Sequence, residues 1–122
     1  MRVLVCGGRN FGDKHFIFEC LSSYHKNTPI TKLIHGAAKG VDSLAGLWAA
    51  KNNIPVITFP ILPKDWSLYG NEAGLVRNKM MLVSSHPEMV IAFPGGNGTK
   101  HMVTISKKAG IPVTFYHKDI QK

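Results

Sequence analysis

A glycine-rich stretch, Phe93–Thr99, limits the possible folds of this chain more than any other feature of the sequence. It follows the apolar run Met89–Ala92 and precedes residues 99–109, whose apolar side chains recur at helical spacing. A strand that breaks into a turn and opens a helix brings unpaired backbone N–H groups and the positive helix end to one point. Glycines also remove Cβ atoms that would keep an anion away from the backbone. The stretch therefore favours a phosphate-sized anion site over an ordinary connecting turn.

The rest of the chain alternates short apolar runs with helical patterns. Strand-like runs cover residues 2–6, 31–35, 54–59, 89–93 and 113–116, and helical patterns cover residues 17–24, 41–49, 72–83 and 99–109. Continuous apolar strands that alternate with helices are typical of a parallel sheet covered on both faces. With right-handed crossovers, we expect a single doubly wound, Rossmann-like α/β domain over residues 1–122, with five parallel strands in the order 3-2-1-4-5 flanked by helices.

Length and composition fit one such domain. The 122 residues are enough for one core, and 44% hydrophobic with 18% charged residues is typical of a globular protein. No apolar run is long enough to cross a bilayer, and the first strand leaves no room for a targeting segment, so we expect a cytoplasmic protein without a membrane partner. Cys6 and Cys20 lie in apolar surroundings and the histidines lack metal-ligand spacing, so neither a metal nor a cofactor is expected.

Two segments between these elements are less regular. The stretch Pro60–Asn71 is predicted to be a long loop, and such loops in compact domains are often functional. Its Trp66 and Tyr69 either stack on a nucleobase or plug a hydrophobic gap under the loop. The polar tail, residues 117–122, is expected to be frayed.

Three glycine-bearing turns follow strands one, two and four, at residues 7–9, 35–42 and 94–99. Because the carboxyl ends of parallel strands lie at one edge of a sheet, we expect these turns to meet and form one pocket for a negatively charged group. None of them is a Walker motif, and the first lacks the G-x-G-x-x-G spacing of a dinucleotide-binding turn. The formal charge of +8 also favours acidic partners.

Four motifs occur in order: Val-Cys-Gly-Gly-Arg at 5–9, Ile-His-Gly-Ala-Ala-Lys-Gly-Val-Asp at 34–42, Val-Arg-Asn-Lys-Met at 76–80 and Phe-Pro-Gly-Gly-Asn-Gly-Thr at 93–99. Together they resemble the SLOG superfamily of Rossmann-like proteins, and within it the small YspA/YpsA-related group. The resemblance covers nearly the whole chain. It implies that a nucleotide or a nucleotide-derived phosphorylated ligand binds in the crevice, as in a sensor, a carrier or a sequestering module.

The LOG enzymes of this superfamily hydrolyse the N-glycosidic bond of nucleoside 5′-monophosphates and carry the pattern Pro-Gly-Gly-x-Gly-Thr-x-x-Glu. In this chain Met102 stands at the position of that glutamate and His101 precedes it. The phosphate-binding half of the pattern is therefore present, whereas the catalytic carboxylate is not. A LOG-like phosphoribohydrolase is the alternative function, and it would have to use Asp42 or His101 instead.

The candidate site residues follow from the turns and from the resemblance. Catalytic candidates are Asp42, Arg77 and His101, and ligand-binding candidates are Gly7, Gly8, Arg9, His35, Gly36, Asn78, Pro94, Gly95, Gly96, Asn97, Gly98 and Thr99. Several have a structural alternative: Asp42 suits a helix cap, and Arg9 and Arg77 suit either a bidentate phosphate contact or a surface salt bridge. His101 is either an acid–base group or a solvated contact, and His35 is expected to be partly buried with its hydrogen bonds satisfied.

Two further expectations concern partners. Single-stranded nucleic-acid binding is a third candidate function, because the DNA-processing protein DprA belongs to the same superfamily and the chain is basic. Proteins of the superfamily often form dimers, so a homodimer is expected. The third helix is its candidate surface, with apolar residues at Ala73, Val76, Met80 and Val83 and with Arg77 and Asn78 on the other face.

Overall fold

The computed structural model describes residues 1–117 and contains one parallel sheet in the order β3-β2-β1-β4-β5. Its strands are β1 (Arg2–Cys6), β2 (Lys32–His35), β3 (Val56–Thr58), β4 (Met89–Ala92) and β5 (Val113–Phe115). The predicted fold class and strand order are therefore confirmed. Of the tail expected to be frayed, residues 118–122 lie outside the described residues.

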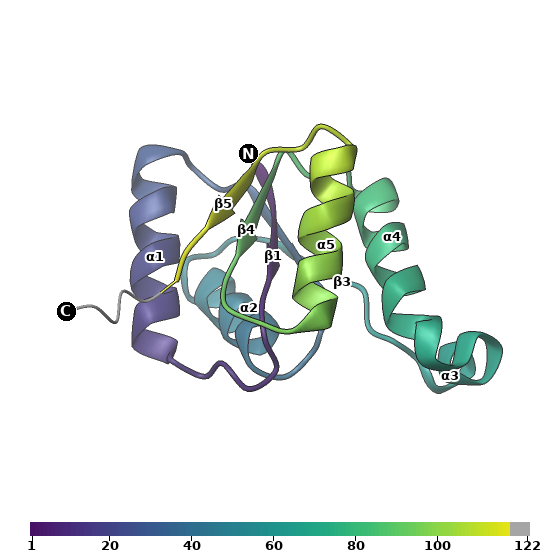
Figure 1. Ribbon diagram of the computed structural model, residues 1–122. Coiled ribbons are helices and arrows are strands. Elements are labelled where there is room, and N and C mark those ends of the chain that lie inside the picture. The colour runs from purple at the N-terminus through teal and green to yellow at the C-terminus, as the bar shows by residue number, and fades with distance from the viewer. Residues whose placement is uncertain (118–122) are drawn as a thin grey trace.

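Two layers of helices enclose the sheet (Figure 1). Helices α1 (Lys14–Asn27) and α2 (Val41–Lys51) pack against each other on one face, and α4 (Ala73–Ser85) and α5 (Asn97–Lys108) do so on the other. Alternate residues of β1 serve the two cores, because successive strand side chains point to opposite faces. Val3 and Val5 join the core under α1 and α2, whereas Leu4 and Cys6 join the core under α4 and α5. The parallel strands are held in place by these two cores, so their carboxyl ends lie at one edge of the sheet.

The stretch between β3 and α4 differs from its prediction as a long loop. It contains a short helix, α3 (Pro63–Tyr69), and a 3-10 turn, η1 (Gly70–Glu72). Pro63 at the first helical position and the Asp65 carboxylate, which accepts from the backbone N–H of Leu62 at 2.8 Å, together start the helix. Seven residues are too few to show an apolar period, so the sequence pattern did not reveal α3.

Helix α4 has one buried face and one exposed face that carries apolar side chains. Met80 and Val83 are 55% and 62% exposed, whereas Ala73, Asn78, Met81 and Leu82 are buried. Of the apolar residues expected along this helix as a candidate dimer surface, Met80 and Val83 are therefore exposed, whereas Ala73 is buried. The buried face includes a polar side chain, Asn78, whose amide is hydrogen-bonded.

Within residues 1–117, no helix has the length and apolar character needed to cross a membrane.

Candidate functional site

The loops after β1, β2 and β4 touch one another through backbone hydrogen bonds. The N–H of Gly8 donates to the carbonyl of Pro94 at 2.8 Å, and the N–H of Val41 donates to the carbonyl of Gly8 at 3.2 Å. The β1–α1 loop is thus joined directly to both of the others. The predicted convergence of the three glycine-bearing turns at one edge of the sheet is confirmed.

Some glycines in these turns allow the loops to approach, whereas others leave open space. A Cβ atom on Gly95 would lie 2.7 Å from the backbone nitrogen of Gly8, and one on Gly40, whose φ is +75°, would lie 2.6 Å from the carbonyl oxygen of Arg9. Such distances are too short for any side chain, so these two positions need glycine for packing. At Gly96 and Gly98 an added Cβ would meet nothing within 4 Å. The latter two glycines thus keep space clear at the edge of the sheet.

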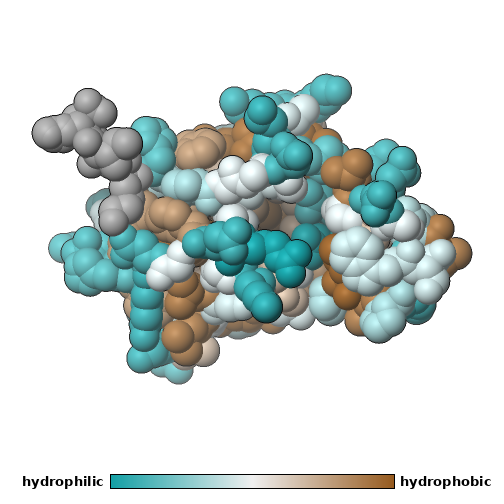
Figure 2. Space-filling view, turned by 60° about the horizontal axis from the view of Figure 1, so that its bottom comes forward, coloured by the Kyte–Doolittle hydropathy of each residue, from teal (hydrophilic) through white to brown (hydrophobic). Residues whose placement is uncertain are grey.

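A cleft of about 680 Å³ opens where the loops meet, and its walls also include α3 and α4. Figure 2 looks toward this end of the molecule and shows a hollow with strongly hydrophilic side chains beside it. The predicted site residues that line it are Gly7, Gly8, Arg9, Gly36, Asp42, Arg77, Asn78, Gly96, Asn97, Gly98 and Thr99. Those outside the lining are His35, Pro94, Gly95 and His101. The volume is within the range of about 300–1,000 Å³ that is usual for small-molecule sites.

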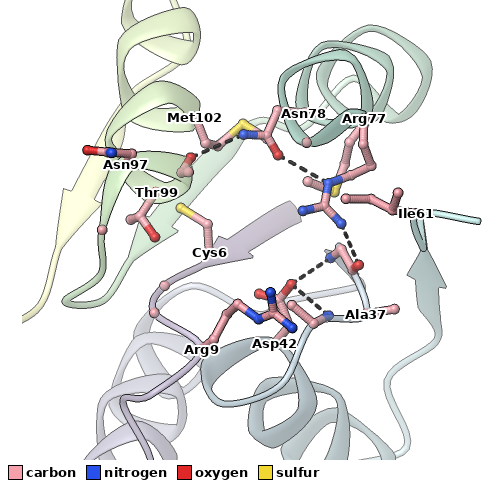
Figure 3. A pocket seen from close by; sticks show the side chains of 18 of the residues that line it. Cys6, Arg9, Ala37, Asp42, Ile61, Arg77, Asn78, Asn97, Thr99 and Met102 are labelled. Atoms are coloured by element: carbon pink, nitrogen blue, oxygen red, sulfur yellow. Dashed lines mark hydrogen bonds between the residues drawn. The ribbon is translucent and has the colours of Figure 1, made fainter. Parts of the chain in front are cut away.

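One side of the cleft is the N-terminus of α5. Gly96 is the N-cap residue, and its carbonyl accepts from the N–H of Lys100 at 3.0 Å, so the helical hydrogen bonds begin there. The first turn contains no acidic residue that would neutralise the positive end of the helix dipole. Arg9, an exposed cation, lies at the lower rim (Figure 3). This side of the cleft therefore attracts anions.

Asp42 lies at the second loop and is only 6% exposed. Its Oδ2 accepts from the backbone N–H groups of Gly36 at 3.1 Å and Ala38 at 3.2 Å, both of which precede the helix. The N-cap of α2 is Gly40, without a side-chain hydrogen bond. The expected alternative role of Asp42 as a helix cap is thus wrong, because the carboxylate instead fixes the loop between β2 and α2.

The environment of Asp42 also changes its acidity. Burial raises the pKa of this carboxyl to about 6, against the opposing effects of the Ala38 N–H, the positive charge of Arg77 and the Gly36 N–H. A carboxyl group with this pKa gains or loses its proton near neutral pH. It is the one member of the predicted catalytic set that both lines the cleft and titrates in this range.

Replacing Asp42 with asparagine is expected to change how stability depends on pH. The folded protein holds the Asp42 proton more tightly than the unfolded chain does, so wild-type stability falls as pH rises from about 4 to about 6. We expect the free energy of unfolding of wild type to fall by about 2–3 kcal/mol relative to Asp42→Asn across that window. Urea denaturation at half-unit pH steps measures the difference. Parallel profiles for the two proteins would contradict the raised pKa.

Arg77 reaches across the cleft from α4. Its Nη1 donates to the carbonyls of Gly36 at 2.6 Å and Phe59 at 3.2 Å, and its Nε donates to Oδ1 of Asn78 at 3.2 Å. The remaining guanidinium nitrogen, Nη2, takes no part in these bonds and points into the pocket (Figure 3). Burial lowers the pKa of Arg77, and the nearby Asp42 carboxylate opposes that shift. Arg77 is therefore a structural clip between β2, β3 and α4 that also presents one donor to the cleft.

Asn78 connects α4 to the start of α5. Its Nδ2 donates to the carbonyl of Gly98 at 3.1 Å and lies 3.2 Å from Nδ1 of His101. His101 is therefore a neighbour of Asn78 rather than part of the cleft wall. Met102, at the position of the LOG glutamate, is 1% exposed in the core under α4 and α5 and contributes a thioether to the lining.

His35 has the partly buried, satisfied environment that was its structural alternative. It is 6% exposed, and its Nδ1 accepts from the N–H of Ala37 at 2.9 Å. Burial lowers its pKa, and the Arg77 charge adds to the shift. His35 thus supports the loop from below the cleft.

Part of the lining was not predicted as site residues. These positions include Asn10, Ala37, Ala38, Pro60, Ile61, Asn71, Gly74 and Leu75. The residues between Pro60 and Leu75 carry no glycine motif, and their position depends on how α3 and α4 pack. Only the exposed aromatic Trp66, noted as a base-stacking candidate, pointed to this wall.

Comparisons with known proteins concern the family and the fold of the chain. The model of the YspA, cpYpsA-related SLOG family matches residues 1–69. The Gene 61 protein of Mycobacterium phage D29 is 32% identical over 117 residues, which cover 92% of this chain and 93% of that protein. The X-ray structure of DNA processing protein A (DprA) from Streptococcus pneumoniae superimposes with a TM-score of 0.76 at 16% identity and covers 99% of this chain. The chain spans about half of that DprA chain, 52%, and at this identity the likeness concerns the fold alone.

Proposed function

The chain belongs to the YspA, cpYpsA-related SLOG family, and from that premise we propose that it binds a nucleotide or a nucleotide-derived phosphorylated ligand in the cleft. The observation that carries this proposal is the N-terminus of α5, which opens on the cleft without an acidic residue in its first turn. A sensor, a carrier or a sequestering module would need such binding without turnover.

Three features support phosphate as the group bound at α5. The first-turn N–H groups of the helix have no intrahelical acceptors and suit anion oxygens. Gly96 and Gly98 line the cleft without a Cβ, so the backbone is open to close approach. Arg9 adds positive charge at the rim of the cleft, and Nη2 of Arg77 adds it in the middle of the cleft.

Replacing Gly98 with alanine is expected to weaken binding of nucleoside monophosphates at least tenfold while leaving the fold intact. The new methyl group meets no protein atom but stands at the lining of the cleft. Because alanine favours helix over glycine, the free energy of unfolding should rise by about 0.5–1 kcal/mol. Titration calorimetry and thermal unfolding measure the two effects.

The matched control for this variant is Gly12→Ala. A Cβ on Gly12 also meets nothing within 4 Å, but Gly12 is outside the cleft lining. It should bind nucleotides as wild type does. Equal affinity of the Gly98 and Gly12 variants would contradict a phosphate site at α5, and so would the absence of any binding to wild type.

Hydrolysis of the bound nucleotide remains the alternative, and the raised pKa of Asp42 is the observation that favours it. A buried Met102 at the glutamate position and a His101 outside the lining count against it. Chromatography for free base after incubation with nucleoside monophosphates separates the two functions. Base release that disappears in Asp42→Asn would assign the enzyme function.

Two further proposals concern macromolecular partners. The charge of +8 favours single-stranded nucleic acid as a second candidate ligand, as does the likeness in fold to a DNA processing protein. Met80 and Val83, with Val76, Lys79 and Ser84, form a shallow apolar depression on α4, which is the candidate surface of a homodimer. Salt-dependent oligonucleotide titration and light scattering address these proposals. The cytoplasmic location stays a prediction.

A further inference from the structure

Helix α3 is set apart from the body of the molecule. Figure 1 shows it at the far end of α4, away from the sheet. It packs on η1 and α4 rather than on a strand, and neither α3 nor η1 contains a buried residue. The two cores of the domain therefore do not depend on α3. A short helix that adds little to the core, yet is held beside the cleft, needs another explanation.

The side chain that α3 brings to the cleft is Trp66. It is 50% exposed and lines the cleft together with Ile61 and Leu75, the latter 44% exposed. A half-exposed indole in a cleft that also contains two aliphatic side chains offers a flat apolar surface in contact with water. A planar aromatic group of a ligand would bury the largest part of this apolar surface. The surface has no charge with which to hold a phosphate.

The cleft has two unlike walls on opposite sides. The apolar wall contains Ile61, Trp66 and Leu75, and the anion-binding wall is the N-terminus of α5 proposed to bind phosphate. Figure 3 shows Asn97 and Thr99 on one side and Ile61 on the other, with Cys6 between them at the floor. Asp42 and Nη2 of Arg77 lie between the two walls and offer hydrogen bonds to hydroxyl groups. A ligand that matches this order has a phosphate at one end, a polar middle and an apolar ring at the other end.

We propose that α3 forms a base-binding subsite in which Trp66 stacks on the nucleobase of a ligand whose phosphate lies at the N-terminus of α5. This inference rests on the proposed function and narrows the ligand from a nucleotide or nucleotide-derived phosphorylated compound to a nucleotide that retains its aromatic base. The sugar then spans the middle of the cleft. Stacking on an aromatic side chain tolerates different bases, so α3 selects for a base without selecting one base strongly.

The two tryptophans of the chain make the proposal measurable. Trp48 is 1% exposed and donates from Nε1 to Oγ of Ser22 at 2.9 Å, so its fluorescence should respond little to a ligand in the cleft. Trp66 is the exposed fluorophore. Titration with adenosine 5′-monophosphate should quench the Trp66 emission and protect it from acrylamide. Ribose 5-phosphate should bind at least tenfold more weakly and leave the emission unchanged.

Variants separate stacking from general effects on the surface. Trp66→Ala should lower the affinity for adenosine 5′-monophosphate at least tenfold, to the level of ribose 5-phosphate, whose own affinity should not change. Trp66→Phe should retain most of the affinity, because it keeps an aromatic face. Leu68→Ala is the matched control, since Leu68 is an apolar residue of the same helix, 71% exposed and outside the cleft lining. It should bind as wild type does.

The outcomes distinguish this inference from the function on which it rests. Equal affinities of wild type for the nucleotide and for ribose 5-phosphate would overturn the base subsite and leave the phosphate site standing. A Trp66→Ala variant with unchanged nucleotide affinity but an altered oligomeric state would also overturn it and assign the residue to a protein interface. If adenosine 5′-monophosphate, ribose 5-phosphate and inorganic phosphate all fail to bind, both proposals fail.

Discussion

Replacing Arg77 with alanine is expected to destabilise the free protein by about 3–5 kcal/mol and to weaken nucleotide binding at least tenfold. The guanidinium donates to the carbonyls of Gly36 and Phe59, which follow β2 and β3, so its loss leaves two loop carbonyls without these donors. Its loss also leaves the buried carboxylate of Asp42 without the positive charge that opposes its raised pKa. Urea denaturation measures the first effect, and titration calorimetry measures the second where the variant is folded.

Lysine at the same position tests the reason for that effect. Arg77→Lys keeps the positive charge near Asp42, but an ammonium group cannot reproduce the planar fork that donates from Nη1 and Nε while presenting Nη2. An intermediate loss of stability is therefore expected. If the free energy of unfolding of Arg77→Ala lies within about 1 kcal/mol of the wild-type value, the clip between β2, β3 and α4 contributes little to stability. The role of Arg77 is then confined to ligand binding.

The fold could be predicted from the sequence because its signals are local and agree with one another. Apolar runs such as Met89–Ala92 predict buried parallel strands, glycines after them predict turns, and right-handed crossovers then leave few possible strand orders. The convergence of the three turns follows from that topology alone, since parallel strands end at one edge.

The roles of single side chains depended on partners that are distant in the sequence. Arg77 binds carbonyls at positions 36 and 59, and Asn78 binds the carbonyl of Gly98, so spacing within α4 could not reveal either contact. The alternative role of Asp42 as a helix cap was wrong for a related reason. Its position near a helix start is typical of a cap, but the shape of the loop turns Gly36 and Ala38 toward its carboxylate.

The place of α3 at the cleft could not be predicted from the sequence either. Seven residues cannot display a helical period, and Trp66 by itself is compatible with a plug as well as with a cleft wall. Its 50% exposure and its place in the cleft lining exclude the buried plug. Packing of α3 on α4, rather than any motif, puts the side chain at the site.

The adjacent glycines Gly95 and Gly96 are expected to respond very differently to the same substitution. Gly95→Ala should cost more than about 3 kcal/mol of stability, or prevent folding, because its Cβ would lie 2.7 Å from the backbone nitrogen of Gly8 and 2.9 Å from Cβ of Thr99. The backbone of Gly8 cannot move away without disturbing its hydrogen bond to the carbonyl of Pro94, which joins the β1 and β4 loops. Gly96→Ala, with a negative φ of −98° and nothing within 4 Å, should stay within about 0.5 kcal/mol of wild type.

The effect on ligand affinity should be larger at Gly96 than at Gly95, provided that the Gly95 variant folds. Gly96→Ala adds a methyl group to the lining of the cleft, so it should retain stability and lose affinity for nucleoside monophosphates. Denaturant midpoints and calorimetric titrations of both variants measure these effects. A Gly95 variant as stable as the Gly96 variant would mean that the β1 and β4 loops separate easily. The N-terminus of α5 would then not be held rigidly beside Gly8, and a preformed phosphate site there would lose its physical basis.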